Sequence, residues 1–170
     1  EDFLAVRDQI SPEYHNSPDY IKLSEKITAL EKSAVGSTFT DFSQATPEGE
    51  MLSLRSVEGK LVLVDFLFSW CKPCRAANRA LVGLYDAYRE RGCTIIGVSL
   101  DRDKEAWIKG IAEDGLQWPQ VSDLQFWQNE ISTFYGIQFI PQNLLIDENG
   151  VIVGKNMEPE ALAVFLENNL

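Results

Sequence analysis

The sequence predicts an α/β fold in which a central mixed β-sheet is flanked by helices. Two nearly unbroken apolar runs rich in β-branched residues, 61–68 and 94–99, have the pattern of strands buried on both faces. Each is followed by a segment with helical character, 72–91 and 103–114. Strands that alternate with helices favour parallel pairing, and a β-hairpin near the C-terminus adds antiparallel strands, so the sheet should be mixed.

The first 35 residues predict a helical segment that precedes this α/β unit. Ser17-Pro18-Asp19 has the features of a helix start, because proline suits the first helical turn. From Tyr20 to Ala34 apolar side chains recur at steps of three and four residues, which gives one apolar face. We therefore expect a helical segment over residues 1–35 and the α/β domain over residues 36–170. The helical segment has the character of a remnant of a larger upstream region.

Turn signals predict two further hairpins, one within 37–54 and one formed by strands 143–146 and 151–155. Periodicity predicts two further helices, an insertion helix over about 125–135 and a last helix from Glu158. The pair Asn149-Gly150 favours a tight turn in the second hairpin. In the helix over 103–114, Trp107, Ile108 and Ile111 fall on one side, which should face the core.

Charge and hydropathy exclude several classes of function. The formal net charge is −11, whereas binding to nucleic acid or to anionic lipid needs a clustered basic surface. No apolar run approaches the roughly 18–20 residues that span a bilayer. The chain begins with Glu1 rather than Met, so we expect a processed or cut form whose targeting signal is not in the sequence.

Three cysteines are present, and two of them form a Cys-x-x-Cys pair, Cys71 and Cys74. Such a pair either exchanges disulfides or helps to hold zinc. Structural zinc takes four ligands, usually including a second Cys or Cys/His pair, and the sequence offers only Cys93 and His15 as partners. The redox interpretation is therefore favoured and no metal is expected. Cys93, which opens a β-branched run, is expected to be a buried core residue, and His15 a loop residue.

The position of the pair gives the redox interpretation a mechanism. Cys71 follows a buried strand and begins a helix, whose N-terminal N–H groups stabilise a thiolate. Lys72 adds positive charge, and Pro73 suits the first turn. Cys71 should be the more exposed sulfur and the nucleophile, and Cys74, one turn into the helix, should resolve the mixed disulfide.

The run from Asp65-Phe66 through Trp70-Cys71-Lys72-Pro73-Cys74-Arg75 resembles the active-site segment of thioredoxin-fold proteins. It is most similar to the thioredoxin-like reductases of the bacterial cell envelope related to TlpA and ResA, in the AhpC/TSA-related thioredoxin-fold family. The resemblance covers about residues 36–170, because further landmarks follow in the family's order: Gly97–Asp101, Tyr135–Ile137, Ile140-Pro141, and Leu144–Asp147 with Gly150.

This resemblance implies a thioredoxin fold with an N-terminal β-hairpin and a helical insertion, and thiol–disulfide oxidoreductase activity of the protein-disulfide reductase type, without a metal or organic cofactor. It also implies protein disulfide or dithiol substrates and an upstream redox partner, such as a membrane electron donor. The implied location is the bacterial periplasm or the outer face of the membrane. The direction of electron flow stays open.

Three positions carry roles from the family. Pro141 matches its cis-proline, which faces the dithiol and lets Ile140 pair with a substrate backbone; a cis bond occurs at only about 5–6% of X–Pro bonds in folded proteins. Asp65 matches a buried acid with a raised pKa that accepts the proton of Cys74, although a strand-end acid bonded to the backbone is the alternative. Trp70 matches the aromatic residue that flanks the first sulfur.

The sequence departs from the family at two places. Ala77 and Arg79 stand where the envelope reductases commonly have Glu and Pro, which leaves Asp65 as the more important acid. Gln142-Asn143 follows Pro141 where Thr, or Ala with Thr, is usual, so the substrate preference can differ.

Two other functions share the predicted fold. A peroxiredoxin-like peroxidase should carry Pro-x-x-x-Thr-x-x-Cys, but Val64 and Phe68 occupy the Pro and Thr positions before Cys71. A non-catalytic interaction domain is disfavoured by the intact cysteine pair and by Pro141. The aromatic residues of the middle region are expected to pack in the core, with an exposed subset near the dithiol able to guide substrates: Trp107, Trp118, Phe126 and Trp127.

Overall fold

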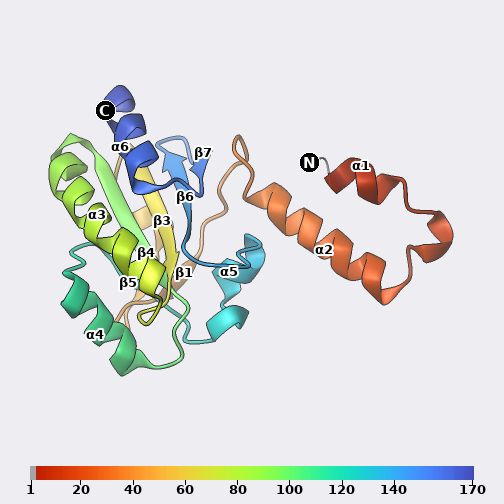
Figure 1. Cartoon of the computed structure of the whole chain (residues 1–170), viewed down its shortest axis with the longest axis horizontal. Coiled ribbons are helices and arrows are strands. Elements are labelled where there is room, and N and C mark those ends of the chain that lie inside the picture. Colours follow the sequence, from red (N-terminus) through yellow and green to blue (C-terminus); the bar gives the residue numbers. More distant parts are fainter. Residues whose placement is uncertain (1–2) are drawn as a thin grey trace.

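The computed structural model describes residues 3–170, which are built around one five-stranded mixed β-sheet (Figure 1). The strands are β1 (Ser43–Ala45), β2 (Met51–Ser53), β3 (Leu61–Leu67), β4 (Cys93–Ser99), β5 (Gln120–Val121), β6 (Gln142–Asp147) and β7 (Ile152–Lys155). The α-helices are α1 (Phe3–Asp8), α2 (Pro18–Lys32), α3 (Lys72–Tyr88), α4 (Lys104–Asp114), α5 (Glu130–Phe134) and α6 (Pro159–Asn169). Short 3-10 turns cover Pro12–Tyr14, Leu54–Ser56, Arg89–Arg91 and Phe126–Gln128.

The strand order is β5-β4-β3-β6-β7, and it confirms the predicted mixed sheet. β3 is central and pairs in parallel with β4, which pairs in parallel with β5. On its other side β3 pairs antiparallel with β6, and β6 with β7. The helical crossovers α3 and α4 join the parallel strands, and a short turn joins β6 to β7. This is the thioredoxin fold that the resemblance implies.

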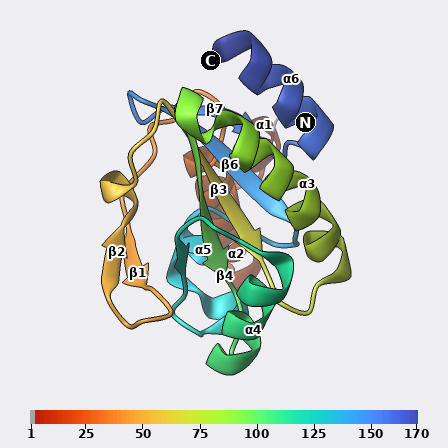
Figure 2. The ribbon, with the colours of Figure 1, turned by 90° about the vertical axis from the view of Figure 1, so that its left-hand side faces the viewer.

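Alternate side chains of β3 point to opposite faces of the sheet, because successive residues of a strand alternate. Leu61 and Leu63 pack with Leu81 of α3 and Leu162 of α6. Val62, Val64 and Phe66 face the other way, in a cluster with Ile131 and Tyr135 from the α5 region. Every residue of β3 is buried, as the unbroken apolar run predicts. Figure 2 shows the β1–β2 hairpin beside the sheet, away from α3 and α6.

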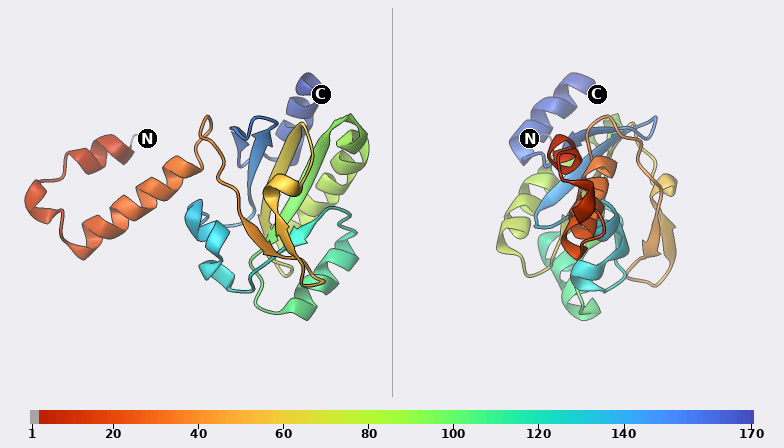
Figure 3. Two further views of the ribbon diagram at one scale, coloured as in Figure 1. Left: turned by 180° about the vertical axis from the view of Figure 1, so that it is seen from behind. Right: turned by 90° about the vertical axis from the view of Figure 1, so that its right-hand side faces the viewer.

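The α1–α2 pair projects from the sheet as a helical arm (Figure 3). Only the second half of α2 is anchored firmly: Ile27 is buried, and Gly136, just after α5, lies against Ala29. Gly136 has a φ of +66°, and a Cβ at this position would meet Ala29 Cβ at 3.1 Å. A glycine is therefore required there by both the backbone and the contact.

The predicted insertion helix over 125–135 is wrong in detail. The segment is a 3-10 turn, Phe126–Gln128, followed by the separate helix α5. Asn129 divides them, because its side chain accepts a hydrogen bond from Ser132 N–H at 3.0 Å and caps a new helix. The two-residue strand β5 was not predicted, since it is too short to show a periodic pattern.

Two further expectations also need correction. Ile108 does not face the core with Trp107, because it is 41% exposed whereas Trp107 is 2% exposed. The helix predicted to start at Ser17-Pro18-Asp19 does so, but its apolar pattern extends to Ala34 whereas the helix ends earlier, at Lys32, with Ser33 as its C-cap. Among residues 3–170, no helix combines the length and the apolar character that a membrane span requires.

Candidate active site

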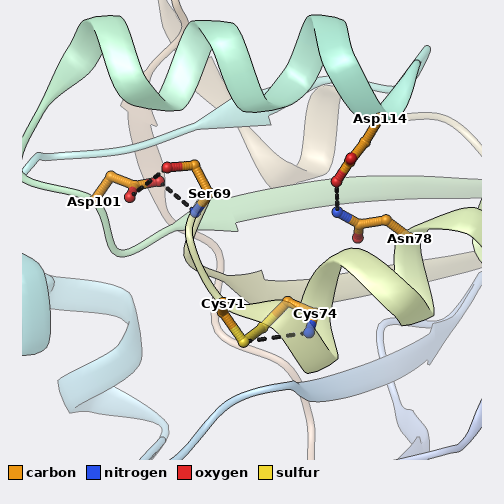
Figure 4. The surroundings of a disulfide bond; sticks show 6 residues. All are labelled: Ser69, Cys71, Cys74, Asn78, Asp101 and Asp114. Atoms are coloured by element: carbon orange, nitrogen blue, oxygen red, sulfur yellow. Dashed lines mark hydrogen bonds between the residues drawn. A yellow bond between two sulfur atoms is a disulfide. The ribbon is translucent and has the colours of Figure 1, made fainter.

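Cys71 and Cys74 form a disulfide where the chain passes from β3 into α3 (Figure 4). Their Cα atoms are 5.3 Å apart, within the range that disulfide geometry allows. β3 ends at Leu67 and α3 begins at Lys72. Cys71 therefore lies just beyond the C-terminal end of the central strand, and Cys74 lies in the first turn of the helix.

Cys71 is the N-cap residue of α3. Its Sγ accepts a hydrogen bond from the Cys74 backbone N–H at 3.2 Å, which a serine or aspartate oxygen does at other helix starts. Pro73 lies in the first turn, where its missing N–H leaves no hydrogen bond unmade. After reduction, a thiolate at Cys71 therefore has a backbone donor and the positive end of the helix dipole beside it. The side chain of Lys72 is exposed.

The two cysteine residues differ in exposure in the predicted order. Cys71 is 7% exposed and Cys74 is 1% exposed, and both pack in a cluster with Leu67, Phe68 and Leu100. A substrate disulfide can reach Cys71 first, while Cys74 is shielded by α3. The unequal exposure is the geometry that a nucleophile and a resolving cysteine require.

Asp65 lies on β3 with its carboxyl on the α3 side of the sheet, and it is 3% exposed. None of the described residues forms a hydrogen bond or ion pair with it, so the alternative of an acid bonded to the backbone is not what the structure shows. Loss of hydration raises the pKa of Asp65 to about 7. A carboxyl with this pKa can both accept and release a proton near neutral pH.

A small cavity of about 90 Å³ connects Asp65 with the surface. Its lining includes Ala77 of α3, Pro141 and Asn143 near the start of β6, and the exposed Glu158. This volume has room for several water molecules, and both carboxyl groups can hold them. The space beside Ala77 therefore gives the buried acid a path for exchanging its proton with solvent.

The Ile140–Pro141 peptide bond is cis, as the resemblance implies. Pro141 lines the Asp65 cavity, and the neighbouring Phe139 is 60% exposed. Gln142 is buried: its amide oxygen accepts from Gln138 N–H and its amide nitrogen donates to Asn156. The Gln142 side chain therefore holds the loop together and does not face a substrate.

Aromatic side chains cover one flank of the dithiol. Phe68 stacks on Trp70 with ring centroids 4.6 Å apart, and it contacts Phe126 at 5.0 Å and Trp127 at 5.3 Å. Trp70 is 63% exposed and Trp127 is 38% exposed, whereas Trp107 and Trp118 are buried. The expectation of core packing thus holds for Trp107 and Trp118. Trp70 and Trp127 instead offer an apolar surface beside Cys71.

Sequence reasoning missed the polar residues that hold the two sides of the dithiol. Before Cys71, Ser69 donates both its backbone N–H and its hydroxyl to the carboxylate of Asp101. After Cys74, Arg75 and Asn78 bond to Asp114. The partners are more than 30 residues apart in sequence, and apart from the landmark run that contains Asp101 no local pattern marks them.

A model of the AhpC/TSA family matches residues 35–155. This chain belongs to the AhpC/TSA family. Among curated relatives, it is 34% identical over 119 residues to the thiol-disulfide oxidoreductase ResA of Geobacillus thermodenitrificans, covering 70% of this chain and 67% of the relative. It is 32% identical over 123 residues to ResA of Bacillus anthracis, covering 72% and 69%.

Solved structures with the same fold are also similar to this chain. A thiol-disulfide oxidoreductase from Bacteroides fragilis is 35% identical, with a TM-score of 0.72 over 78% of this chain and 99% of that one. A thioredoxin-like protein from Bacteroides caccae, 16% identical, shares the fold over 99% of this chain and 60% of its own, with a TM-score of 0.83. Together with the Cys71–Cys74 disulfide, these matches identify the protein as a thiol–disulfide oxidoreductase that exchanges disulfides through its Cys-x-x-Cys pair.

The two remaining candidates from the sequence lie apart from this family site. Cys93 is buried at the start of β4, and burial raises the pKa of its thiol to about 11. His15 lies in the helical arm, where its ring stacks on Tyr20 and bonds to the Ile10 carbonyl. Within residues 3–170, no three His, Cys, Asp or Glu side chains gather in an arrangement that could hold a metal ion.

Proposed function

We propose that this oxidoreductase reduces protein disulfides, with Cys71 as the nucleophile, Cys74 as the resolving thiol and Asp65 as the proton acceptor. The observations that support the proposal are a slightly exposed N-cap cysteine, a second cysteine that is 1% exposed, and a buried acid on the preceding strand that has no bonding partner among the described residues. Each group then has the environment that its step requires.

The reaction balances in two exchanges. The Cys71 thiolate attacks a substrate disulfide, which forms a mixed disulfide and releases one substrate thiolate. Asp65 accepts the proton of Cys74, and the Cys74 thiolate attacks Cys71 Sγ, which closes the Cys71–Cys74 disulfide and releases the second thiolate. Two electrons pass to the substrate, and an upstream dithiol donor, such as a membrane electron donor, must restore the dithiol.

The substrate backbone is proposed to lie against Ile140 and the cis-Pro141, with Trp70 against its side chains. Supporting this, Phe139 and Trp70 are both more than half exposed, and Phe139 and Pro141 both line the cavity of Asp65. An extended segment in this position would present its disulfide to Cys71.

The proposed location is the bacterial periplasm or the outer face of the membrane, where protein disulfides form and need reduction or rearrangement. Similarity to envelope oxidoreductases supports this location. A β-lactamase or alkaline phosphatase fusion to the native gene, assayed for activity that requires export, would test it; activity only inside the cell would contradict the proposal.

Trapping separates the roles of the two cysteines. In Cys74→Ser, Cys71 should accumulate as a mixed disulfide with insulin, visible by mass spectrometry, whereas Cys71→Ser should form none. The wild-type protein should reduce insulin, and alkylation of the reduced protein should label Cys71 first. An unreactive Cys71 would contradict the assignment, and rapid consumption of hydrogen peroxide would favour a peroxidase.

The direction of electron flow is set by the reduction potential. The helix N-terminus and Lys72 stabilise the thiolate, which makes the Cys71–Cys74 pair more oxidising. The buried Asp65 disfavours further negative charge near the dithiol, which makes the pair more reducing. Equilibration with glutathione buffers measures the balance, in which about 30 mV corresponds to 1.4 kcal/mol. A value near about −120 mV, typical of a strong oxidant, would contradict the reductase direction.

A further inference from the structure

The loop before the dithiol is tied to the end of β4 by one buried carboxylate. Asp101 is 1% exposed, and its Oδ2 accepts from Ser69 N–H at 3.0 Å while its Oδ1 accepts from the Ser69 hydroxyl at 2.9 Å. Oδ2 also accepts from the hydroxyl of Ser99 at 2.8 Å, and that hydroxyl accepts from Asp101 N–H. Figure 4 shows Asp101 and Ser69 facing each other beside the disulfide.

The bonds to Ser69 act close to the attacking sulfur. Ser69 is two residues before Cys71, and the backbone between them carries the exposed Trp70. In addition, a backbone–backbone hydrogen bond from Leu100 N–H to Leu67 O at 2.9 Å joins the ends of β3 and β4. The carboxylate therefore fixes Ser69, and a turn bond from Cys71 N–H to Phe68 O at 3.2 Å leads from this anchored segment into the helix.

Helix α4 packs closely against the same residue. A Cβ at Gly110 would lie 2.8 Å from Ser69 Cβ, so the helix approaches Ser69 as closely as a glycine allows. The far end of α4 reaches the opposite flank of the dithiol, where Asp114 accepts from Arg75 Nη2 at 2.6 Å and from Asn78 Nδ2 at 2.8 Å. Ser69 thus contacts both Gly110 and Asp101, while the C-terminal end of α4 bonds to α3.

We propose that Asp101 is a positioning residue for the dithiol, acting through its hydrogen bonds to Ser69. By fixing Ser69, it holds Cys71 Sγ at the helix N-terminus, in hydrogen-bond contact with Cys74 N–H. When Asp101 is removed, the loop gains freedom, the sulfur spends less time at this donor, and the thiolate loses part of its stabilisation. This inference rests on the proposed role of Cys71 as the nucleophile.

Three variants separate geometry from charge and from general damage. Asp101→Ala removes every bond to Ser69. Asp101→Asn removes the charge but keeps an oxygen for Ser69 N–H and offers an N–H to the Ser69 hydroxyl, which can accept as well as donate. Asp103→Ala is the matched control, because Asp103 caps α4 through Glu105 and Ala106 N–H groups and does not bond to Ser69.

The readout is the rate at which iodoacetamide alkylates Cys71 in the reduced chain of residues 1–170 between pH 5 and 9. The elements around the dithiol contribute several other charged groups: Lys72 and Arg75 of α3, Asp65 of β3, Arg102 after β4, and Glu113 and Asp114 of α4. All of them are unchanged in the three variants. Urea unfolding of the oxidised proteins reports stability separately.

Asp101→Ala should raise the midpoint pH of alkylation by about one unit and so slow the reaction about tenfold below that midpoint. Asp101→Asn and Asp103→Ala should keep the wild-type midpoint and rates within about twofold, even where their stability falls. If Asp101→Ala does not fold, Ser69→Ala, which loses only the hydroxyl bond, should shift the midpoint in the same direction by a smaller amount.

A wild-type midpoint in Asp101→Ala would overturn the inference, as would an equal shift in Asp103→Ala or Asp101→Asn. These results leave the proposed function intact, because the wild-type Cys71 still reacts. An inert Cys71 in the wild-type protein would instead contradict the proposed function, and this inference with it.

Discussion

Asp65 is buried beneath the dithiol helix without a hydrogen-bonding or charged partner among the described residues, and its pKa is raised from 3.8 to about 7. The unfolded chain releases this proton near pH 4, whereas the folded protein keeps it until about pH 7. Between these values the folded state binds more protons, so the stability of the protein falls as the pH rises. A salt-bridged acid has the opposite effect.

Replacing Asp65 by Asn should therefore stabilise the protein above pH 7, by up to roughly 4 kcal/mol, and should remove this part of the pH dependence. Urea unfolding of the oxidised protein at pH 5 and pH 8 measures it. The wild-type protein should lose stability between these values and Asp65→Asn should lose much less. The exposed Asp86 of α3 supplies the control, since Asp86→Asn should keep the wild-type slope. Equal slopes in all three proteins would contradict a raised pKa at Asp65.

Cys93 should be inert in the native protein. Its thiol is buried and its pKa is raised to about 11, so at pH 8 only about one molecule in a thousand carries the reactive thiolate. Iodoacetamide at pH 8 should label Cys71 of the reduced protein and leave Cys93 unmodified until urea unfolds the protein. Peptide mapping by mass spectrometry distinguishes the three sites. Native labelling of Cys93 at the rate of Cys71 would show that the β4 start opens readily.

The residues proposed to carry the chemistry could be identified from the sequence. Cys71 and Cys74 are recognisable by their spacing, and Asp65 and Pro141 by the resemblance to thioredoxin-fold proteins. Asp101 was not predicted to matter, because an aspartate after a strand is ordinary and its partner Ser69 lies 32 positions earlier. Only the fold brings these two residues together.

At the scale of elements, α4 is joined to α3 by a buried carboxylate. The side chain of Asp114 is 6% exposed and accepts from both Arg75 and Asn78, whereas the neighbouring Glu113 is 45% exposed and pairs with Arg75 and Lys109. The two acids are adjacent in sequence and share a partner, so they form a natural comparison of a buried and an exposed ion pair.

Asp114→Ala should lower the free energy of unfolding by about 2 kcal/mol, because it leaves Asn78 and Arg75 without their main acceptor in a shielded position. Glu113→Ala should cost less than about 0.5 kcal/mol, as exposed ion pairs usually do. Chemical unfolding of both variants at neutral pH makes the comparison. Similar losses in the two would mean that burial of Asp114 adds nothing to the helix contact.

Long elements with a clear period were predicted within a few residues, and short ones were not. β3, β4 and α3 are specified by their own apolar patterns. β5 has two residues and exists because it pairs with Gly97 and Val98 of β4, which is a tertiary contact. The break at Asn129 depends on a cap that competes with a longer helical pattern, and propensity alone does not decide between them.

At the scale of the whole molecule, we propose that residues 36–170 form the catalytic unit and that the helical arm is dispensable for exchange chemistry. A chain of residues 36–170 should fold and reduce insulin at a rate similar to that of the full chain. It should be less stable by about 2 kcal/mol, because the buried side chain of Ile27 no longer covers the α5 region. Thermal unfolding and insulin turnover measure both quantities, and an inactive but folded product would contradict the division.

A single substitution tests the arm contact itself. In the full chain Gly136→Ala suffers both a strained φ and a clash with Ala29, whereas in the shorter chain only the strain remains. The destabilisation should therefore be larger in the full chain. Equal destabilisation in both would mean that the arm does not press on α5 in solution.

The indole of Trp70 gives the protein a built-in optical signal. Trp70 directly precedes Cys71, and its ring stacks on Phe68, which packs in one cluster with both sulfurs. Disulfides quench the fluorescence of nearby indoles by accepting an electron from the excited state, and a dithiol does so far less. Emission should therefore brighten when the bond opens, so each turnover can be followed in real time without a dye or a label.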